Sequence, residues 1–174
     1  MPLRSPEAFL ESLRDGRRVI YRGQGVPDVT VHPHLGRGAA HVAVDFRLAH
    51  ERPADPLFVD RDAPDRPASR YFTIPRTTAD LVRRRDLIEA VTREARSFVP
   101  IVKEIGTDAL FALMIVTAGM ARTLGTPYHE RVRACYDRCR DGDLAMAVAQ
   151  TDAKGDRSRR PAEQANPDAY VRRV

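Results

Sequence analysis

Apolar and polar positions recur along most of this chain with the period of an α-helix, and the pattern predicts a mainly helical protein. The first helix begins at Ser5-Pro6-Glu7, where a hydroxyl can cap the helix, Pro fits the first helical position and an acid meets the positive helix end. We expect it to end at Gly16 and to bury one apolar stripe, made of Ala8, Phe9 and Leu13 with Leu10 beside them.

A short β-hairpin and a second helix are expected next. The hairpin joins residues 18–21 to residues 25–26 through Arg22-Gly23-Gln24, and an irregular turn is the alternative. The second helix begins at His32-Pro33-His34. Its inward positions are apolar, and they are Ala39, Ala40, Val42, Ala43, Phe46, Leu48 and Ala49.

The longest helix is expected over residues 78–98, where Thr77-Thr78-Ala79-Asp80 supplies the N-terminal cap. We interpret Arg83-Arg84-Arg85 as its solvated face. Apolar residues follow a helical period on the other side, with breaks, and they are Leu81, Val82, Leu87, Ile88, Val91, Ala95 and Phe98.

A markedly apolar helix is expected from Ala109 to Arg122, capped by Gly106-Thr107-Asp108. Because it is hydrophobic nearly all round, we expect it to be central and buried, with Gly119 permitting close helix packing. Pro127 begins a last helix that ends near Arg140.

Non-helical segments separate and follow these helices. Residues 51–68 contain Pro53, Pro56, Pro64 and Pro67, which favours an ordered surface loop. Residues 70–74 alternate weakly, as in a strand, and the apolar run 144–150 predicts a buried strand that leads into a polar turn.

That turn, Thr151-Asp152-Ala153-Lys154-Gly155-Asp156-Arg157, is the most chemically dense stretch of the chain. It offers a hydroxyl, two carboxylates, an ammonium, a guanidinium and a Gly that lets the backbone approach a ligand. The acids offset the bases, so charge alone does not indicate a phosphate site. Two interpretations remain open: a solvated surface turn, or a loop that binds a large polar cofactor at the end of a strand.

Three stretches in the same order resemble one known family. The turn at 151–157 is similar to a T-D-P-K-G-D-R run, and the segments at 5–33 and 166–172 resemble the family's opening and its continuation. The family is that of 4-hydroxyphenylacetate 3-hydroxylase and 4-hydroxybutyryl-CoA dehydratase, and the resemblance covers nearly the whole chain. It implies the N-terminal helical domain of an acyl-CoA dehydrogenase-like fold over residues 1–142, and the truncated start of the middle β-domain over residues 143–174.

The resemblance also implies a cofactor and partners. It makes the turn a contact for FAD, which a separate flavin reductase supplies in reduced form, and it implies a homotetramer in the full-length family. The substrate would be a small aromatic compound or an acyl-CoA. The expected cofactor-binding residues are Gln150, Thr151, Lys154, Gly155, Asp156 and Arg157.

The chain departs from both branches of the family. Dehydratases have a C-x-x-x-C pair that helps to bind an iron–sulfur cluster, and the matching positions here are Pro100 and Glu104. Hydroxylases have a substrate-binding Arg and Tyr near the start of the next helix, which are missing around residues 106–109, and a His where this chain has Val148. No catalytic residue is therefore assigned.

Cys135 and Cys139 lie four residues apart, on one face of the last predicted helix. Two thiolates at this spacing can bind one metal ion, but a structural zinc site needs four ligands. Small positions on a half-buried helix are the simpler interpretation, and no metal site is predicted. The five histidines show no H-E-x-x-H spacing.

Composition narrows the function classes. The net charge of +5 comes from arginines scattered among 24 acidic residues, with few aromatics, which disfavours nucleic-acid binding. Two cysteines and the lack of a signal-like start or a run of 18 apolar residues indicate a cytoplasmic protein without a membrane partner. The sequence contains no G-x-S-x-G, Walker A or G-x-G-x-x-G run, which disfavours a hydrolase, a P-loop protein or a Rossmann protein.

We therefore expect the N-terminal portion of an FAD-dependent monooxygenase of the 4-hydroxyphenylacetate 3-hydroxylase type. Two alternatives remain: a 4-hydroxybutyryl-CoA dehydratase or isomerase relative without its iron–sulfur ligands, and a non-catalytic, truncated helical module. Whether the chain is an enzyme stays open, and we expect it to be inactive by itself, because family members are much longer.

Overall fold

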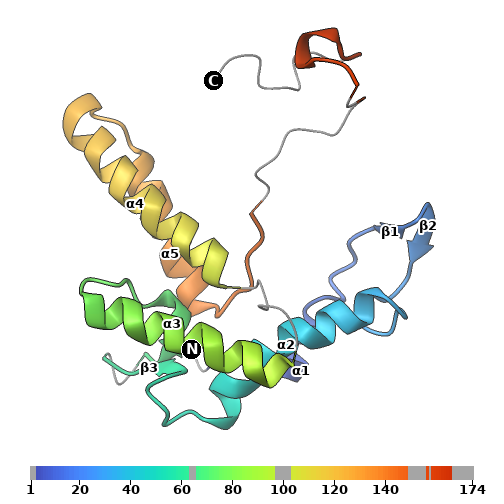
Figure 1. Ribbon diagram of the computed structural model, residues 1–174, viewed down its shortest axis with the longest axis horizontal. Coiled ribbons are helices and arrows are strands. Elements are labelled where there is room, and N and C mark those ends of the chain that lie inside the picture. Colours follow the sequence, from blue (N-terminus) through green and yellow to red (C-terminus); the bar gives the residue numbers. More distant parts are fainter. Residues whose placement is uncertain (1–2, 63–65, 97–102, 149–155, 157, 166–174) are drawn as a thin grey trace.

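The computed structural model describes residues 3–62, 66–96, 103–148, 156 and 158–165. Helices make up most of this part, so the predicted mainly α class is confirmed. Figure 1 shows α4 (Glu104–Leu124) and α5 (Tyr128–Asp141) as an antiparallel pair that rises on one side of α2 and α3. A β-hairpin extends on the other side, and α1 (Pro6–Glu11) lies along α2 (Leu35–Glu51).

The N-terminal segment forms much as its sequence predicts. The Ser5 hydroxyl accepts a hydrogen bond from the backbone N–H of Ala8 at 3.1 Å, which caps α1. The helix ends at Glu11 and not at Gly16, because the Leu13 N–H donates to the carbonyl three residues back, as in a tightened last turn. Gly16 has a φ of 80°, and there the chain turns into the hairpin.

The hairpin pairs β1 (Val19–Tyr21) with β2 (Gln24–Val26), as predicted. Tyr21 lies opposite Gln24, so two residues form the loop. Their φ angles are 49° at Arg22 and 81° at Gly23, the pair of positive values that matches the twist of such a hairpin.

Two apolar clusters make the core. One stacks Phe9 of α1 on Phe46 of α2, with ring centroids 4.5 Å apart, and includes Ala43. The other joins α2, α3 (Thr78–Ala95) and the loop between them, and its buried members are Leu48, Ala49, Phe58, Val59, Tyr71, Leu87 and Val91. Ala40 was predicted to face inward and is exposed, whereas the acidic Asp45 is buried.

The Pro-rich loop contains more structure than predicted. Two-residue strands, β3 (Val59–Asp60) and β4 (Ala68–Ser69), pair antiparallel within it. The strand expected at 70–74 is wrong: Arg70–Phe72 forms the 3₁₀ turn η1, because the Thr73 N–H bonds back to the Arg70 carbonyl.

Helix α3 begins with the predicted capping box, in which the Thr77 hydroxyl accepts from the Asp80 N–H and the Asp80 carboxylate accepts from the Thr77 N–H. Two of its expected core residues, Leu81 and Val82, are instead exposed. The interpretation of 83–85 as a solvated face is wrong for Arg84, which is buried.

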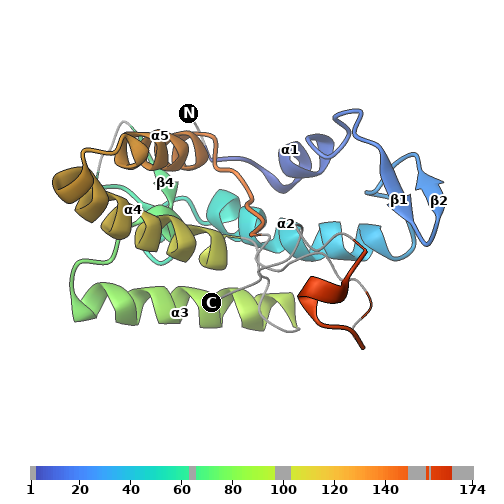
Figure 2. The same ribbon diagram turned by 90° about the horizontal axis from the view of Figure 1, so that it is seen from above.

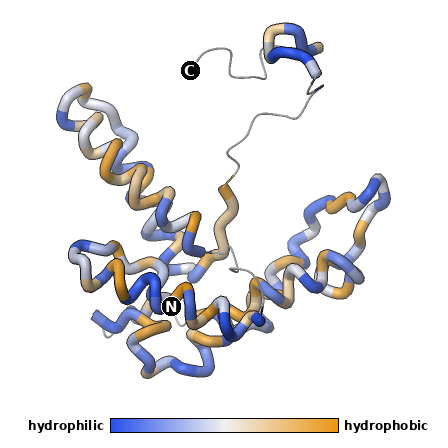
Figure 3. Tube along the Cα trace, in the orientation of Figure 1, coloured by the Kyte–Doolittle hydropathy of each residue, from blue (hydrophilic) through white to orange (hydrophobic). Residues whose placement is uncertain are grey.

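Helix α4 differs most from its prediction. It begins at Glu104, five residues early, and its 21 residues make it longer than α3. Figure 2 shows α5 beside it, and Figure 3 shows apolar residues at intervals along much of its length. The expectation that α4 is buried all round is wrong, because several large apolar side chains are exposed: Ile105, Leu113, Ile115, Val116 and Leu124.

Two further features of α4 bear on its surroundings. A Cβ at Gly119 would meet nothing within 4 Å, so the predicted close packing there is wrong for the described chain. By length and composition α4 could cross a membrane, contrary to expectation. Of its apolar window, 33% is buried inside the described fold. Its contacts with α5 and η1 show that part of it is a packing helix.

Candidate functional site

The predicted cofactor segment lies almost entirely outside the described residues. Of its six expected contacts, only Asp156 is described, and its side chain is exposed. One carboxylate oxygen accepts from the N–H of Ser158 at 3.0 Å and from its hydroxyl at 2.6 Å, which lowers the pKa of Asp156. The other oxygen lies 3.3 Å from Arg159, so the Asp156 carboxylate is engaged locally. The expectations for Gln150, Thr151, Lys154, Gly155 and Arg157 lie outside the described residues.

The segment that leads to this region, residues 144–148, was predicted as part of a buried strand. It has no strand pairing, and Ala145, Ala147 and Val148 are exposed, so that prediction is wrong for these five residues. Leu144 and Met146 are half-buried, so burial alternates along the segment as in a strand, but the segment has no hydrogen-bonded partner strand among the described residues. The physical reason is that no neighbouring strand lies beside it among the described residues.

The chain enters this segment through a well-defined helix end. The N–H of Asp143 donates to the Arg140 carbonyl and the N–H of Leu144 donates to the Cys139 carbonyl, which is the double bond of a Schellman motif. Asp143 takes the left-handed position, with a φ of 45°, where Gly is usual.

That acid meets a buried lysine. The Lys103 ammonium, whose side chain is 0% exposed, donates to the Asp143 carboxylate at 2.7 Å. It lies 3.6 Å from Asp45 Oδ2 and 3.9 Å from the centroid of the Phe46 ring. The second oxygen of Asp143 accepts from the backbone N–H of Arg4 at 3.3 Å. One cation thus ties α2, the start of α4, the end of α5 and the N-terminal segment together.

Burial makes this cluster electrostatically unusual. Removal from water, together with repulsion from Asp143 and Glu104, raises the pKa of Asp45 to about 6 even though Lys103 opposes the change. Asp45 therefore holds a proton more readily in the folded chain than a free carboxyl does.

A second buried cation lies at the first turn of α4. The Arg84 guanidinium donates to the carbonyls of Tyr71 and Glu104, at 3.1 and 2.9 Å, and to the Thr107 hydroxyl at 2.8 Å. It also pairs with Asp108 at 2.8 Å. An Arg and a Tyr thus reach the start of α4 from other elements, but Arg84 is held by protein acceptors, which makes it an anchor and not a free anion-binding group.

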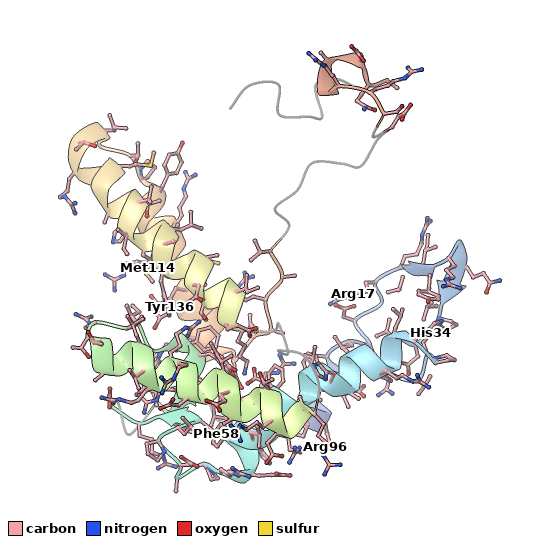
Figure 4. The ribbon with its side chains drawn as sticks, viewed as in Figure 1. Arg17, His34, Phe58, Arg96, Met114 and Tyr136 are labelled. Atoms are coloured by element: carbon pink, nitrogen blue, oxygen red, sulfur yellow. The ribbon has the colours of Figure 1, made fainter. Side chains whose placement is uncertain are left out.

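The α4–α5 pair is attached to the rest of the fold by Tyr136 as well. Figure 4 shows this side chain at the base of the pair, where it approaches α3 and the loop before it. Its hydroxyl donates to the Phe72 carbonyl at 2.5 Å, and its ring centroid lies 6.2 Å from that of Phe111. These contacts fix the base of the pair and leave its far end exposed.

A groove of about 540 Å³ runs between α1, α2 and the segment at 144–147. Its lining includes the apolar residues Phe9, Val42 and Met146 and the basic residues Arg4 and Arg17. The described residues do not by themselves enclose a flavin, because the groove is open and Asp156 does not line it.

The cysteines of α5 follow the simpler interpretation. Cys135 is exposed and Cys139 is buried, and burial raises the pKa of the Cys139 thiol. Within the described ranges, no group of three or more His, Cys, Asp or Glu side chains could bind a metal ion.

Sequence reasoning missed Lys103, Asp45 and Asp143. Composition contained one signal: the chain has 29 basic residues, and Lys occurs only at positions 103 and 154. A lysine retained in a chain that otherwise uses arginine is a candidate for a site that needs a compact ammonium and not a planar guanidinium.

Comparisons with known proteins agree on one family. The family described as "4-hydroxyphenylacetate 3-hydroxylase N terminal" matches residues 5–174. The oxygenase component of 4-nitrophenol 4-monooxygenase/4-nitrocatechol 2-monooxygenase from Rhodococcus opacus is 30% identical over 90% of this chain and 31% of its own length.

Solved structures agree on the fold. An archaeal 4-hydroxybutyryl-CoA dehydratase from N. maritimus is 27% identical, with a TM-score of 0.81 over 97% of this chain and 33% of its own. The oxygenase component of 4-hydroxyphenylacetate 3-monooxygenase, complexed with FAD and 4-hydroxyphenylacetate, is 23% identical, with a TM-score of 0.79 over 94% of this chain and 33% of its own. The described chain therefore has the N-terminal, acyl-CoA dehydrogenase-like helical fold, and it spans about a third of the length of these relatives.

Proposed function

Because the chain belongs to the 4-hydroxyphenylacetate 3-hydroxylase N-terminal family, we propose that it is the N-terminal portion of an FAD-dependent oxygenase component that hydroxylates a small phenol. The match over residues 5–174 carries this proposal, since it includes the T-D-A-K-G-D-R turn. FAD, when bound, supplies the oxygen-activating chemistry. This chain would contribute the turn at 151–157 as one edge of the flavin site, with its helices as one wall.

Partners follow from the same kinship. Relatives are named as oxygenase components, which supports a separate reductase as the source of reduced flavin and a small aromatic compound as the substrate. We extend to this chain a homotetramer, as the resemblance implies, and a cytoplasmic location with no membrane and no nucleic-acid partner, as its composition indicates. The exposed apolar residues of α4 support the idea that further protein covers this helix.

A dehydratase or isomerase is the second candidate, since one related structure is a 4-hydroxybutyryl-CoA dehydratase. The chain does not favour it, because the position that would supply a cluster cysteine is Glu104. This residue is 5% exposed, and its carbonyl accepts from Arg84 inside the fold. A third candidate is a non-catalytic helical module. It is supported by Asp156, whose carboxylate contacts only the neighbouring Ser158 and Arg159 among the described residues.

Flavin retention by the purified chain separates the module from the flavoproteins. We expect little FAD after gel filtration, since the described residues enclose no flavin. Stoichiometric FAD in the eluted chain would contradict this expectation and would show that 174 residues complete a flavin site.

The reaction is tested on the longest product of the encoding gene. It is supplied with FAD, a flavin reductase, NADH and oxygen, and offered 4-hydroxyphenylacetate or 4-nitrophenol in one arm and 4-hydroxybutyryl-CoA in the other. We expect a catechol from the phenol arm, detected by mass spectrometry. Turnover of the CoA thioester without phenol hydroxylation would replace the first candidate by the second.

A further inference from the structure

The ion pair between Lys103 and Asp143 coincides with an unusual backbone conformation at Asp143. Asp143 occupies the left-handed position after α5, which costs a non-Gly residue about 1 kcal/mol or more. Gly would suit the Schellman motif better, yet an acid stands there and its side chain is 2% exposed. Backbone strain of this kind persists where surrounding contacts fix it, and here the contact is the Lys103 ammonium at 2.7 Å.

A second contact holds the chain three residues later. A Cβ placed on Gly106 would lie 2.6 Å from the Cβ of Met146, so Met146 packs directly on the backbone of the first turn of α4. Lys103 and Gly106 therefore hold Asp143 and Met146 from the same end of the same helix. Two fixed points therefore hold residues 143–146 against the first turn of α4.

From these contacts we infer that Lys103 and Asp143 are positioning residues: they fix the start of the segment after α5 and thereby limit where the proposed flavin-contacting turn, further along the chain, can lie. This inference rests on the proposed function, which assigns the turn to flavin. Asp45 supplies the second carboxylate beside the ammonium, and the Arg4 N–H fixes the second oxygen of Asp143. The Lys103–Asp143 ion pair is buried, and neither residue needs to touch the cofactor.

Methionine methyl NMR on the flavin-free chain tests the anchor. The Met146 methyl should show a nuclear Overhauser contact with Gly106, and Met114 and Met120 of α4 report whether the helix remains folded. In Asp143→Gly, and in Lys103→Met combined with Asp143→Gly, we expect this contact to be lost and the Met146 signal to move to its position in the urea-unfolded chain. The Met114 and Met120 signals should stay in place. A Met146 signal that stays in place in both variants would overturn the anchor.

Two further variants keep the test decisive. Asp143→Asn tolerates the left-handed backbone and changes only the charge, so it covers the case in which the harsher variants unfold. We expect it to weaken the Met146 contact, and an unchanged contact would count against the inference. Asp141→Asn is the matched control, because it removes a carboxylate from the same helix end that pairs with Arg66, whose side chain is 61% exposed, and it should leave Met146 unchanged.

Flavin affinity then tests the positioning role of Lys103 and Asp143, measured in a longer product of the gene that binds FAD. We expect Asp143→Asn to weaken FAD binding by about tenfold and Asp141→Asn to leave it unchanged. Equal affinities in both variants, with Met146 displaced, would refute the positioning role and leave the anchor. A product that binds no FAD at all would instead sink the proposed function, while the methyl signals would still decide the anchor.

Discussion

The two halves of α4 invert the usual arrangement of a soluble helix. In its N-terminal half the polar residues Glu104 and Thr107 are buried, in contact with the Arg84 network, although Ile105 beside them is exposed. Its C-terminal half is apolar and open, with Ile115 75% exposed and Val116 57% exposed. Charges are inside at one end and aliphatic side chains are outside at the other.

The difference shows where the described fold is complete and where it is not. At the N-terminal half, both buried cations, Lys103 and Arg84, have acceptors within the described fold. At the C-terminal half, contiguous exposed apolar residues are typical of a surface that other protein segments cover. The chain spans about a third of its relatives' length, which agrees with such a covering segment.

The largest expected effect is at the buried end. Lys103→Met should lower the free energy of unfolding by about 3–5 kcal/mol, because it leaves Asp45 and Asp143 buried without their cation. Urea denaturation followed by circular dichroism measures it. Arg85→Met, at an exposed ion pair with Asp86, is the control and should cost less than about 0.5 kcal/mol. Equal losses of unfolding free energy in the two variants would show that the buried ion pairs contribute no more than an exposed one.

The apolar boundary between the halves comes next. Phe111→Ala should cost about 3 kcal/mol in urea denaturation, since this ring is 8% exposed and lies beside Tyr136 and Arg84. The matched substitution at the open end, Ile115→Ala, should stay near zero because its side chain is already in water. Comparable costs at both positions would show that the open half is covered in solution, for instance by a second copy.

A pH dependence follows from Asp45. Its pKa is raised to about 6 in the folded chain from the 3.8 of a free aspartate carboxyl, so the folded state binds more protons between these values. Stability from this group is therefore full at acid pH and is lost as pH rises through about 6. Asp45→Asn should remove about 2 kcal/mol of the decline in stability between about pH 4.5 and about pH 7.5. Parallel pH profiles for the variant and the parent chain would refute the raised pKa.

The smallest folding effect is expected at the open end, where it sharpens the comparison most. Ile115→Asn should change the free energy of unfolding of this chain by less than about 0.5 kcal/mol. The same substitution in a longer gene product should reduce stability or assembly, because there the position would be covered. Thermal unfolding and light scattering of both products measure this, and no difference between them would argue against a covering segment.

Local patterns predicted the helices well. The Ser5 and Thr77 caps, the hairpin at Arg22-Gly23 and the start of α5 after Pro127 depend on neighbours within a few residues, so the sequence contains the signal. The strand expected at 70–74 failed because a 3₁₀ turn of similar composition docks against the core. The flavin-contact assignment for 150–157 remains a prediction, carried by resemblance.

What the sequence determined by itself is the order of the helices, several of their caps, the hairpin and membership of the family, because caps, turns and motifs are short-range features. What only the tertiary structure decided is which charges are inside and which apolar residues are outside. Lys103 finds its acids on α2 and after α5, far away in sequence, and Arg84 finds its acceptors on η1 and α4. No periodicity along one helix encodes a partner on another, since burial is set by how the helices pack and not by the pattern on any one of them.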